Sequence, residues 1–121
     1  NFLKNKAIID KIISTSELTG TENVIEIGPG FGILTEALLH NAAHVTSIEK
    51  DDRLIPGLKA QFITEKRFEL IHADALIVPP PTTPYYLIAN IPYSITSPLL
   101  DHFIRYNPDR MPVRAVLLVQ K

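Results

Sequence analysis

Residues 23–35 read Asn23-Val24-Ile25-Glu26-Ile27-Gly28-Pro29-Gly30-Phe31-Gly32-Ile33-Leu34-Thr35. A short β-branched run breaks into three glycines at alternate positions and then resumes with a helical pattern, which predicts a strand, a tight turn and a helix. Glycine has no Cβ and readily adopts positive φ, so such a turn lets the backbone approach a ligand at the carboxyl end of the strand. The alternative is an ordinary strand-to-helix turn that binds nothing.

The glycine spacing indicates which class of ligand the turn suits. A dinucleotide site has the pattern G-x-G-x-x-G, with a pyrophosphate at the helix N-terminus. Here the pattern is G-x-G-x-G, and Glu26 stands two residues before Gly28. A carboxylate at this place repels phosphate and suits a cation. S-adenosylmethionine carries a sulfonium and an ammonium and no phosphate, so we expect Glu26, Gly28 and Gly30 to help bind it.

Composition is typical of one small soluble domain. The chain has 121 residues, of which 45% are hydrophobic and 21% charged, and its net charge of −1 argues against strong nucleic-acid binding by this piece alone. No apolar run approaches the roughly 20 residues of a membrane span, so we expect a cytoplasmic protein without membrane contact. The sequence contains no cysteine, and its four histidines lack metal-ligand spacing, so no metal site is predicted.

Hydrophobic periodicity predicts alternating strands and helices, which indicate a mostly parallel sheet with right-handed crossovers. Four prolines in residues 78–84 predict a loop. The last strand is apolar on both faces and is expected to be central or nearly central in the sheet. The expected strands are 23–27, 44–48, 68–72, 85–89 and 113–119, and the expected helices are 7–18, 32–40, 52–62 and 94–106.

Polar residues end three successive predicted strands. Ligands on parallel sheets bind beyond the carboxyl ends of the strands, so Glu49, Asp74 and Asn90 are expected to share a site. Glu49 follows Gly28 by 21 positions, a distance typical of an acid that binds ribose hydroxyls; the alternative is a charge at a helix N-terminus. Asp74 could accept from the amino group of an adenine ring, or it could simply cap a turn.

The sequence Asn90-Ile91-Pro92-Tyr93 indicates chemistry on an adenine amine. That amine is a poor nucleophile, because its lone pair is delocalised into the ring. The Asn90 side-chain oxygen and the Ile91 main-chain carbonyl could accept its two N–H groups, and Pro92 would stiffen the turn. Tyr93 would stack on the target base. The alternative is a strand-exit turn with a buried tyrosine.

In combination these motifs resemble the ribosomal RNA adenine N6,N6-dimethyltransferases of the KsgA type. The resemblance implies a Rossmann-like class I S-adenosylmethionine-dependent methyltransferase fold with about five strands present. It also implies dimethylation of two adjacent adenosines near the 3′ end of small-subunit ribosomal RNA, with Asn90 and Tyr93 at the target base. The residues that it assigns to the cofactor are Asn1, Leu3, Gly28, Glu49, Asp74 and Asn90. The segments that carry it are Asn1-Phe2-Leu3, E-I-G-P-G-F-G-x-L-T at 26–35, Ile48-Glu49, Asp74-Ala75, N-I-P-Y-x-I-x-x-P-L at 90–99 and the terminal V-Q-K.

The resemblance further implies how the chain is organised. Residues 1–121 are expected to be an incomplete N-terminal catalytic domain, with the last strands and a basic helical RNA-binding domain outside it. The partner would be small-subunit ribosomal RNA or a pre-30S-type particle, and the enzyme would act as a monomer.

Three other functions stay open at this point. A sister family methylates an adenine of large-subunit ribosomal RNA and confers macrolide resistance, and it shares the glycine, acid and N-I-P-Y elements. A non-catalytic ribosome-assembly or transcription factor could keep the same fold and cofactor pocket. A nicotinamide oxidoreductase is disfavoured by the glycine spacing and by Glu26.

Overall fold

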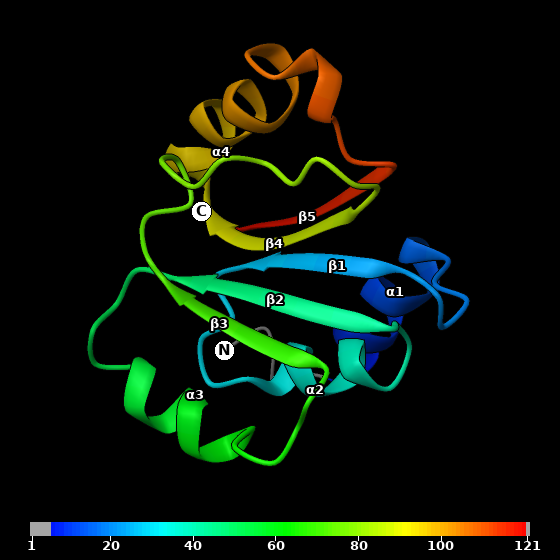
Figure 1. Cartoon of the computed structure of the whole chain (residues 1–121), viewed down its shortest axis with the longest axis vertical. Helices are drawn as coiled ribbons and strands as arrows, with labels where there is room; N and C mark the ends of the chain where they lie inside the picture. The colour runs from blue at the N-terminus through cyan, green and yellow to red at the C-terminus, as the bar shows by residue number, and fades with distance from the viewer. Residues whose placement is uncertain (1–5, 121) are drawn as a thin grey trace.

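The computed structural model describes residues 6–120 as a five-stranded sheet with helices on both faces (Figure 1). Every neighbouring pair of strands is parallel, and the order is β3-β2-β1-β4-β5. The order reverses between β1 and β4, and at such a switch point the loops leave the sheet in opposite directions and open a crevice. The strands are β1 (Asn23–Ile27), β2 (His44–Glu49), β3 (Phe68–His72), β4 (Tyr86–Pro92) and β5 (Arg114–Gln120).

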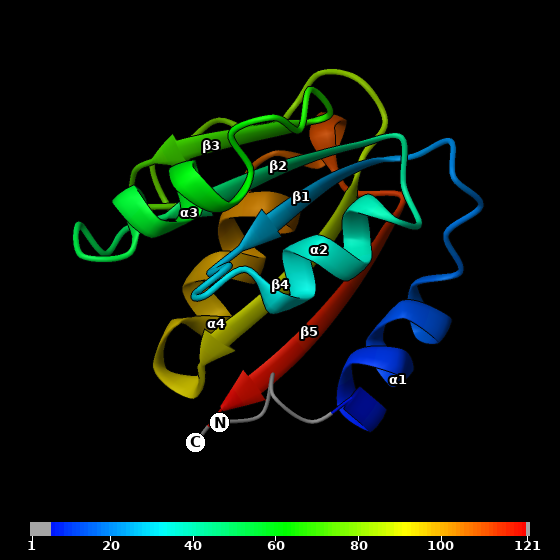
Figure 2. The ribbon, with the colours of Figure 1, turned by 90° about the horizontal axis from the view of Figure 1, so that it is seen from below.

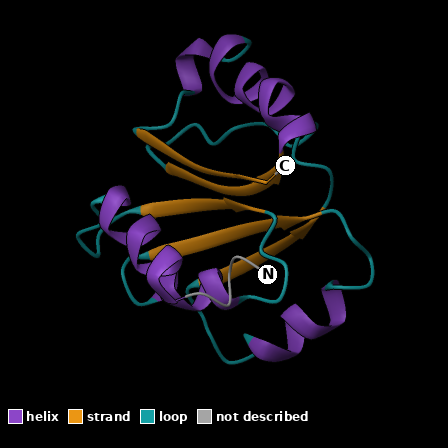
Figure 3. Ribbon diagram, turned by 180° about the vertical axis from the view of Figure 1, so that it is seen from behind, coloured by secondary structure: helices purple, strands orange, loops and turns teal. Residues whose placement is uncertain are grey.

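Two layers of helices cover the sheet, as Figures 2 and 3 show from below and from behind. Side chains alternate between the two faces of a strand, so Val24 belongs to the core on one face and Ile25 to the core on the other. The helices on the first face are α1 (Lys6–Ser16), α2 (Ile33–Leu39) and α3 (Ile55–Gln61); the second carries α4 (Tyr93–Leu100), the π-helical turn Asp101–Arg105 and the 3-10 turn Pro108–Arg110.

Most predicted elements are found, and their ends differ for physical reasons. The predictions for 23–27 and 68–72 match β1 and β3, whereas β4 continues to Pro92 instead of ending at residue 89. The helix expected over 94–106 changes form after Leu100. Pro98 lies inside it and has no N–H to donate, and the Tyr106 N–H donates to the carbonyl of Asp101, five residues back, at 2.8 Å.

The predicted central position of the last strand is wrong for the residues that the structure describes. Within residues 6–120, β5 pairs with β4 alone and forms an edge of the sheet. The helix α1 packs against β5 on one face and α4 contacts it on the other, but each residue of β5 stays partly or fully exposed. The apolar pattern of this strand therefore did not predict its position within the described sheet.

The Glu26 side chain connects the end of β1 to α2 and β2 through hydrogen bonds. Its side chain is 1% exposed, and its Oε1 accepts hydrogen bonds from the Thr35 hydroxyl on α2 at 2.5 Å and the Ser47 hydroxyl on β2 at 2.7 Å. The other oxygen is buried and has no hydrogen-bond partner among the described residues. Burial raises the pKa of Glu26 to about 7, against the opposing effect of the two hydroxyls.

Gly28 packs directly against the end of β4. Its φ is +75°, and a Cβ at this position would lie 2.6 Å from the main-chain oxygen of Asn90. Such a distance is far below van der Waals contact, and the obstacle is backbone that cannot rotate away. The turn therefore requires glycine here for space as well as for its dihedral angle.

The buried Glu26 predicts a pH-dependent stability. Its pKa is about 7 in the folded chain against 4.5 as the ordinary value, so the folded state holds the proton more tightly between these two pH values. The free energy of unfolding should therefore fall as pH rises through this window, by on the order of 3 kcal/mol, and level off above it. Urea unfolding of Glu26→Gln over a pH series should lack this part of the slope. Glu36→Gln, an exposed change on α2, is the control; an unchanged slope in Glu26→Gln would contradict the assignment.

Substitution of Gly28 should lower the stability of the protein by more than backbone strain alone would. Gly20 also has a positive φ, of +97°, but a Cβ there would meet nothing within 4 Å. Gly20→Ala therefore measures backbone strain alone and should lower the free energy of unfolding by about 1 kcal/mol. Gly28→Ala adds a clash with the Asn90 carbonyl and should lower it by about 3 kcal/mol. Urea unfolding at constant pH measures both. Equal losses for the two variants would show that the contact with Asn90 is relieved at no cost.

Candidate functional site

Strand register brings the predicted site residues to one edge of the sheet. Ile27 lies opposite Ile48 on β2 and Ala89 on β4, so the next residues along, Gly28, Glu49 and Asn90, are level with one another. The Gly28 N–H donates to the Ile48 carbonyl at 3.1 Å, which continues the ladder into the turn. Asp74 follows two residues after the end of β3.

These residues line a common cavity of about 190 Å³ beside the glycine turn. Two carboxylates, an amide and the Lys50 ammonium supply its polar side-chain groups, and aliphatic side chains form most of the rest of its wall. The sequence predicted that Glu49, Asp74 and Asn90 would share a site, and the structure does bring them together. The lining residues are Ile27, Gly28, Ile48, Glu49, Lys50, Asp74, Ala75, Leu76, Asn90, Ile91, Pro92, Ile95 and Leu99.

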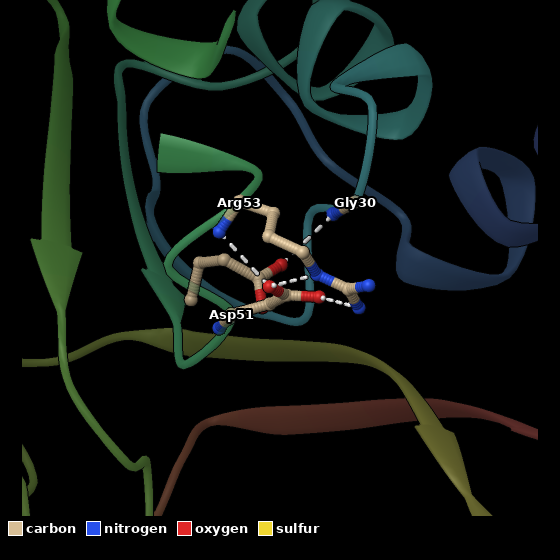
Figure 4. Close-up of polar contacts among 4 residues, drawn as sticks. Gly30, Asp51 and Arg53 are labelled. Atoms are coloured by element: carbon tan, nitrogen blue, oxygen red, sulfur yellow. Dashed lines mark hydrogen bonds and ion pairs between the residues drawn. The ribbon is translucent and has the colours of Figure 1, made fainter. Parts of the chain in front are cut away.

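Backbone N–H groups hold the Glu49 carboxylate. Its Oε1 accepts from the Gly30 N–H at 3.2 Å and its Oε2 from the Asp51 N–H at 3.0 Å, and the side chain is 8% exposed. Figure 4 shows Gly30 and Asp51 around this contact, with Arg53 beside them. The Arg53 guanidinium hydrogen-bonds the Asp51 carboxylate at 2.8 and 3.0 Å and lowers the pKa of that carboxyl to about 2. Each Glu49 oxygen keeps a second lone pair with which it could accept from a ligand.

Asp74 has the turn-capping role considered for it, and its contact with an adenine ring stays a prediction. Its Oδ1 accepts from the Leu76 N–H at 3.0 Å, so it does cap the turn after β3. Its Oδ2 lies 3.6 Å from the Lys50 ammonium, and the side chain is 36% exposed. The second oxygen of Asp74 therefore has as its partner an exposed lysine that also lines the cavity. A cap and a ligand contact are compatible at this residue.

The N-I-P-Y segment is not the turn that was expected. Asn90, Ile91 and Pro92 are the last residues of β4, and α4 begins at Tyr93, because Pro92 has the extended dihedral angles of a strand end. The Asn90 Oδ1 accepts from the Gln120 side-chain amide of β5 at 2.5 Å. Tyr93 is 73% exposed, so the alternative of a buried tyrosine is wrong.

Three predicted residues of the described chain, Glu26, Gly30 and Tyr93, do not line the cavity. Glu26 lies beneath the turn, with its carboxylate held by Thr35 and Ser47, so its contact with a cofactor stays a prediction. Gly30 lies outside the cavity wall but holds Glu49 through its N–H. Asn1 and Leu3 lie outside the described residues.

Sequence reasoning missed two polar residues. Lys50 lines the cavity and pairs with Asp74, and Gln120 holds the Asn90 side chain. Gln120 could have been found by the rule that selected Glu49, because it is also a polar residue at the carboxyl end of an apolar strand. Lys50 gave no such signal beyond its place next to Glu49.

The donor and acceptor set decides what the cavity can hold. Carboxylate oxygens at Glu49 and Asp74 suit a ligand that presents hydroxyl and amino donors, and the bare backbone at Gly28 admits close approach. The aliphatic walls suit a flat ring. These features fit the hydroxyls, amines and adenine of S-adenosylmethionine.

The described residues contain neither a cluster of metal-binding side chains nor a membrane-spanning helix. His72 pairs with Asp52 and His102 with the Val78 carbonyl, each at 2.6 Å, and residues 6–120 contain no group of three or more side chains arranged to hold a metal ion. None of the helices within that range has the length and hydrophobicity to cross a lipid bilayer.

Sequence comparison identifies relatives over the whole chain. Residues 1–121 match the family described as ribosomal RNA adenine dimethylase. The ribosomal RNA small subunit methyltransferases A of Dehalococcoides mccartyi and Prochlorococcus marinus are 41% and 43% identical to it. Each alignment covers 100% of this chain, but only 43% and 46% of the relative. The chain thus spans less than half the length of these curated relatives.

Solved structures show the same fold. The 23S ribosomal RNA methyltransferase ErmE superimposes with a TM-score of 0.86 at 35% identity, covering 99% of this chain and 48% of that one. A dimethyladenosine transferase from Plasmodium falciparum gives a TM-score of 0.85 at 37% identity, covering 100% and 44%. Together with the match over all 121 residues, this places the chain in the ribosomal RNA adenine dimethylase family, with a class I S-adenosylmethionine-dependent methyltransferase fold.

Proposed function

We propose that this protein transfers methyl groups from S-adenosylmethionine to the exocyclic amines of two adjacent adenosines near the 3′ end of small-subunit ribosomal RNA. The observation that carries the proposal is the cavity at the switch point, where Gly28, Glu49, Asp74 and Asn90 meet beside the exposed Tyr93. Membership of the adenine dimethylase family supports it. The protein would act as a cytoplasmic monomer on ribosomal RNA or a pre-30S-type particle.

The cofactor would be held mainly by the strand ends. S-adenosylmethionine, when bound, supplies an electrophilic methyl group on its sulfonium. Glu49 would accept from the ribose hydroxyls, because the Gly30 and Asp51 N–H groups already fix its carboxylate in place. Asp74 would accept from the adenine amino group through the oxygen that now faces Lys50. Gly28 would let the backbone lie against the ligand, since it carries no Cβ.

The target base would be held by the end of β4. The Asn90 side-chain oxygen and the Ile91 main-chain carbonyl would accept the two N–H groups of the amine and draw its nitrogen toward tetrahedral geometry. The reaction would then depend on alignment of the amine with the methyl group, and the proton could leave to solvent after transfer. Tyr93 would stack on the base, and its exposure leaves its ring available for this contact.

Names of relatives favour the small subunit over the large one. Relatives that are 38–43% identical carry the name ribosomal RNA small subunit methyltransferase A, whereas ErmE, at 35%, is named for 23S ribosomal RNA. A non-catalytic factor is disfavoured because Glu49, Asp74, Asn90 and Tyr93 are all present. A protein without methyltransferase activity would not require the Asn90 acceptor or the Tyr93 ring at this site.

Methyl incorporation tests the substrate. The full-length protein and labelled S-adenosylmethionine are incubated with purified small or large ribosomal subunits from cells that lack the corresponding modification. We expect incorporation into small subunits, approaching four methyl groups per particle, and none above background into large subunits. Asn90→Ala should lower the rate by about 10²–10³-fold, because it removes one acceptor of the amine. Incorporation into large subunits alone would overturn the proposal in favour of the macrolide-resistance type.

Tyr93 should matter for the RNA and not for the cofactor. Base–aromatic stacking contributes about 1–3 kcal/mol, so Tyr93→Ala should lower kcat/KM for small subunits by roughly 5–150-fold, while Tyr93→Phe keeps most of the activity. Calorimetric titration should give the same cofactor affinity for both variants. Tyr106→Ala is the matched control, because Tyr106 is 68% exposed but lies at the other end of the helical segment. The stacking role fails if Tyr93→Ala behaves like this control.

A further inference from the structure

Gln120 is the residue whose position the proposed reaction does not yet explain. It is the last residue of β5 and lies opposite Pro92 of β4, two residues beyond the pairing of Asn90 with Leu118. Alternate residues of a strand face the same side, so Asn90 and Gln120 are diagonal neighbours on one face of the sheet. Their side chains meet there, and the Gln120 Nε2 donates to the Asn90 Oδ1 at 2.5 Å.

A hydrogen-bond partner affects which end of an asparagine amide faces a ligand. Its amide group turns easily about χ2, and its oxygen and nitrogen ends have nearly the same shape. If Asn90 turned over, its NH₂ group would face the NH₂ group of Gln120, and two donors would oppose each other. In the arrangement that the structure has, the Gln120 NH₂ group faces Asn90 and favours the orientation that presents the Asn90 oxygen to it. That oxygen has a second lone pair, which stays available to an N–H of the substrate.

Two separate contacts thus fix Asn90. Gly28 packs against its main-chain carbonyl and limits where the backbone of β4 can lie, whereas Gln120 orients the side chain. Among residues 6–120, Gln120 is the hydrogen-bond partner that the structure gives to this side chain. The ladder between β4 and β5 continues to the pair Pro92–Gln120, so the partner sits on paired backbone and not on a loop.

We propose that Gln120 is a positioning residue that holds the Asn90 side-chain oxygen toward the target amine. The inference rests on the proposed function, because it acts through the acceptor role of Asn90. It requires no titrating group: both side chains are neutral amides. Its effect should therefore appear in the rate of methyl transfer and not in the pH dependence of that rate.

Two variants of the full-length protein test this role. Gln120→Met keeps the length of the side chain but removes the donor, and it should lower kcat on small subunits by about tenfold, the effect of one hydrogen bond, with KM for the particle unchanged within twofold. Gln120→Glu offers only acceptors and should draw the Asn90 NH₂ toward itself, so its loss in kcat should be larger. Gln61→Met, on α3, is the matched control.

Double substitution separates positioning from a merely structural role. On an Asn90→Ala background Gln120→Met should cause no further loss, because the group that it orients is gone. The side-chain amide signals of Asn90 in an NMR spectrum, identified by their absence in Asn90→Ala, should shift in Gln120→Met. This signal does not depend on activity and can be read even if catalysis is too slow to measure.

The outcomes distinguish the inference from the proposed function. If the parent protein methylates small subunits and Asn90→Ala lowers the rate as expected, but Gln120→Met keeps full kcat or adds its loss to that of Asn90→Ala, the positioning role is wrong and the function stands. If the parent protein methylates no small subunits, the function itself fails. Urea unfolding of each variant identifies any loss that comes from stability.

Discussion

Close packing of the glycine turn against β4 is the constraint on which the candidate site depends. Gly28 follows β1 where the strand order reverses, one residue beyond the last β1–β4 pair, Ile27 and Ala89. Any Cβ at Gly28 would press on the Asn90 carbonyl. This close contact brings the glycine turn and the candidate amine acceptor to one point.

Main-chain N–H groups orient the carboxylates of Glu49 and Asp74 beside this point. Glu49 accepts two backbone N–H groups and Asp74 accepts one, so each carboxylate is oriented before a ligand arrives. Glu26 uses its carboxylate differently, because it is buried behind the turn and accepts from two hydroxyls. Glu26 thus has a structural role behind the turn, whereas Glu49 and Asp74 line the cavity.

Backbone geometry alone does not distinguish the possible RNA substrates. ErmE and the Plasmodium falciparum transferase superimpose on this chain with TM-scores of 0.86 and 0.85, although the first is named for 23S ribosomal RNA and the second for dimethyladenosine. Under the proposed function the strand ends act on an adenine amine, which the RNA of both subunits contains. Selection between subunits must therefore come from contacts with the RNA around the base, outside the cavity at the strand ends.

Sequence alone determined the strands, the glycine turn and the polar residues that end the strands, because hydrophobic period, glycine spacing and strand ends are local features. It could not place β5, since an apolar run does not distinguish a central strand from a strand at the edge of the described sheet with a helix against each face. The burial of Glu26 and the contact of Gln120 with Asn90 were likewise decided only by tertiary structure. The reason is physical: these partners lie 21 and 30 positions apart in the chain, and only the pairing of strands brings them within hydrogen-bond distance.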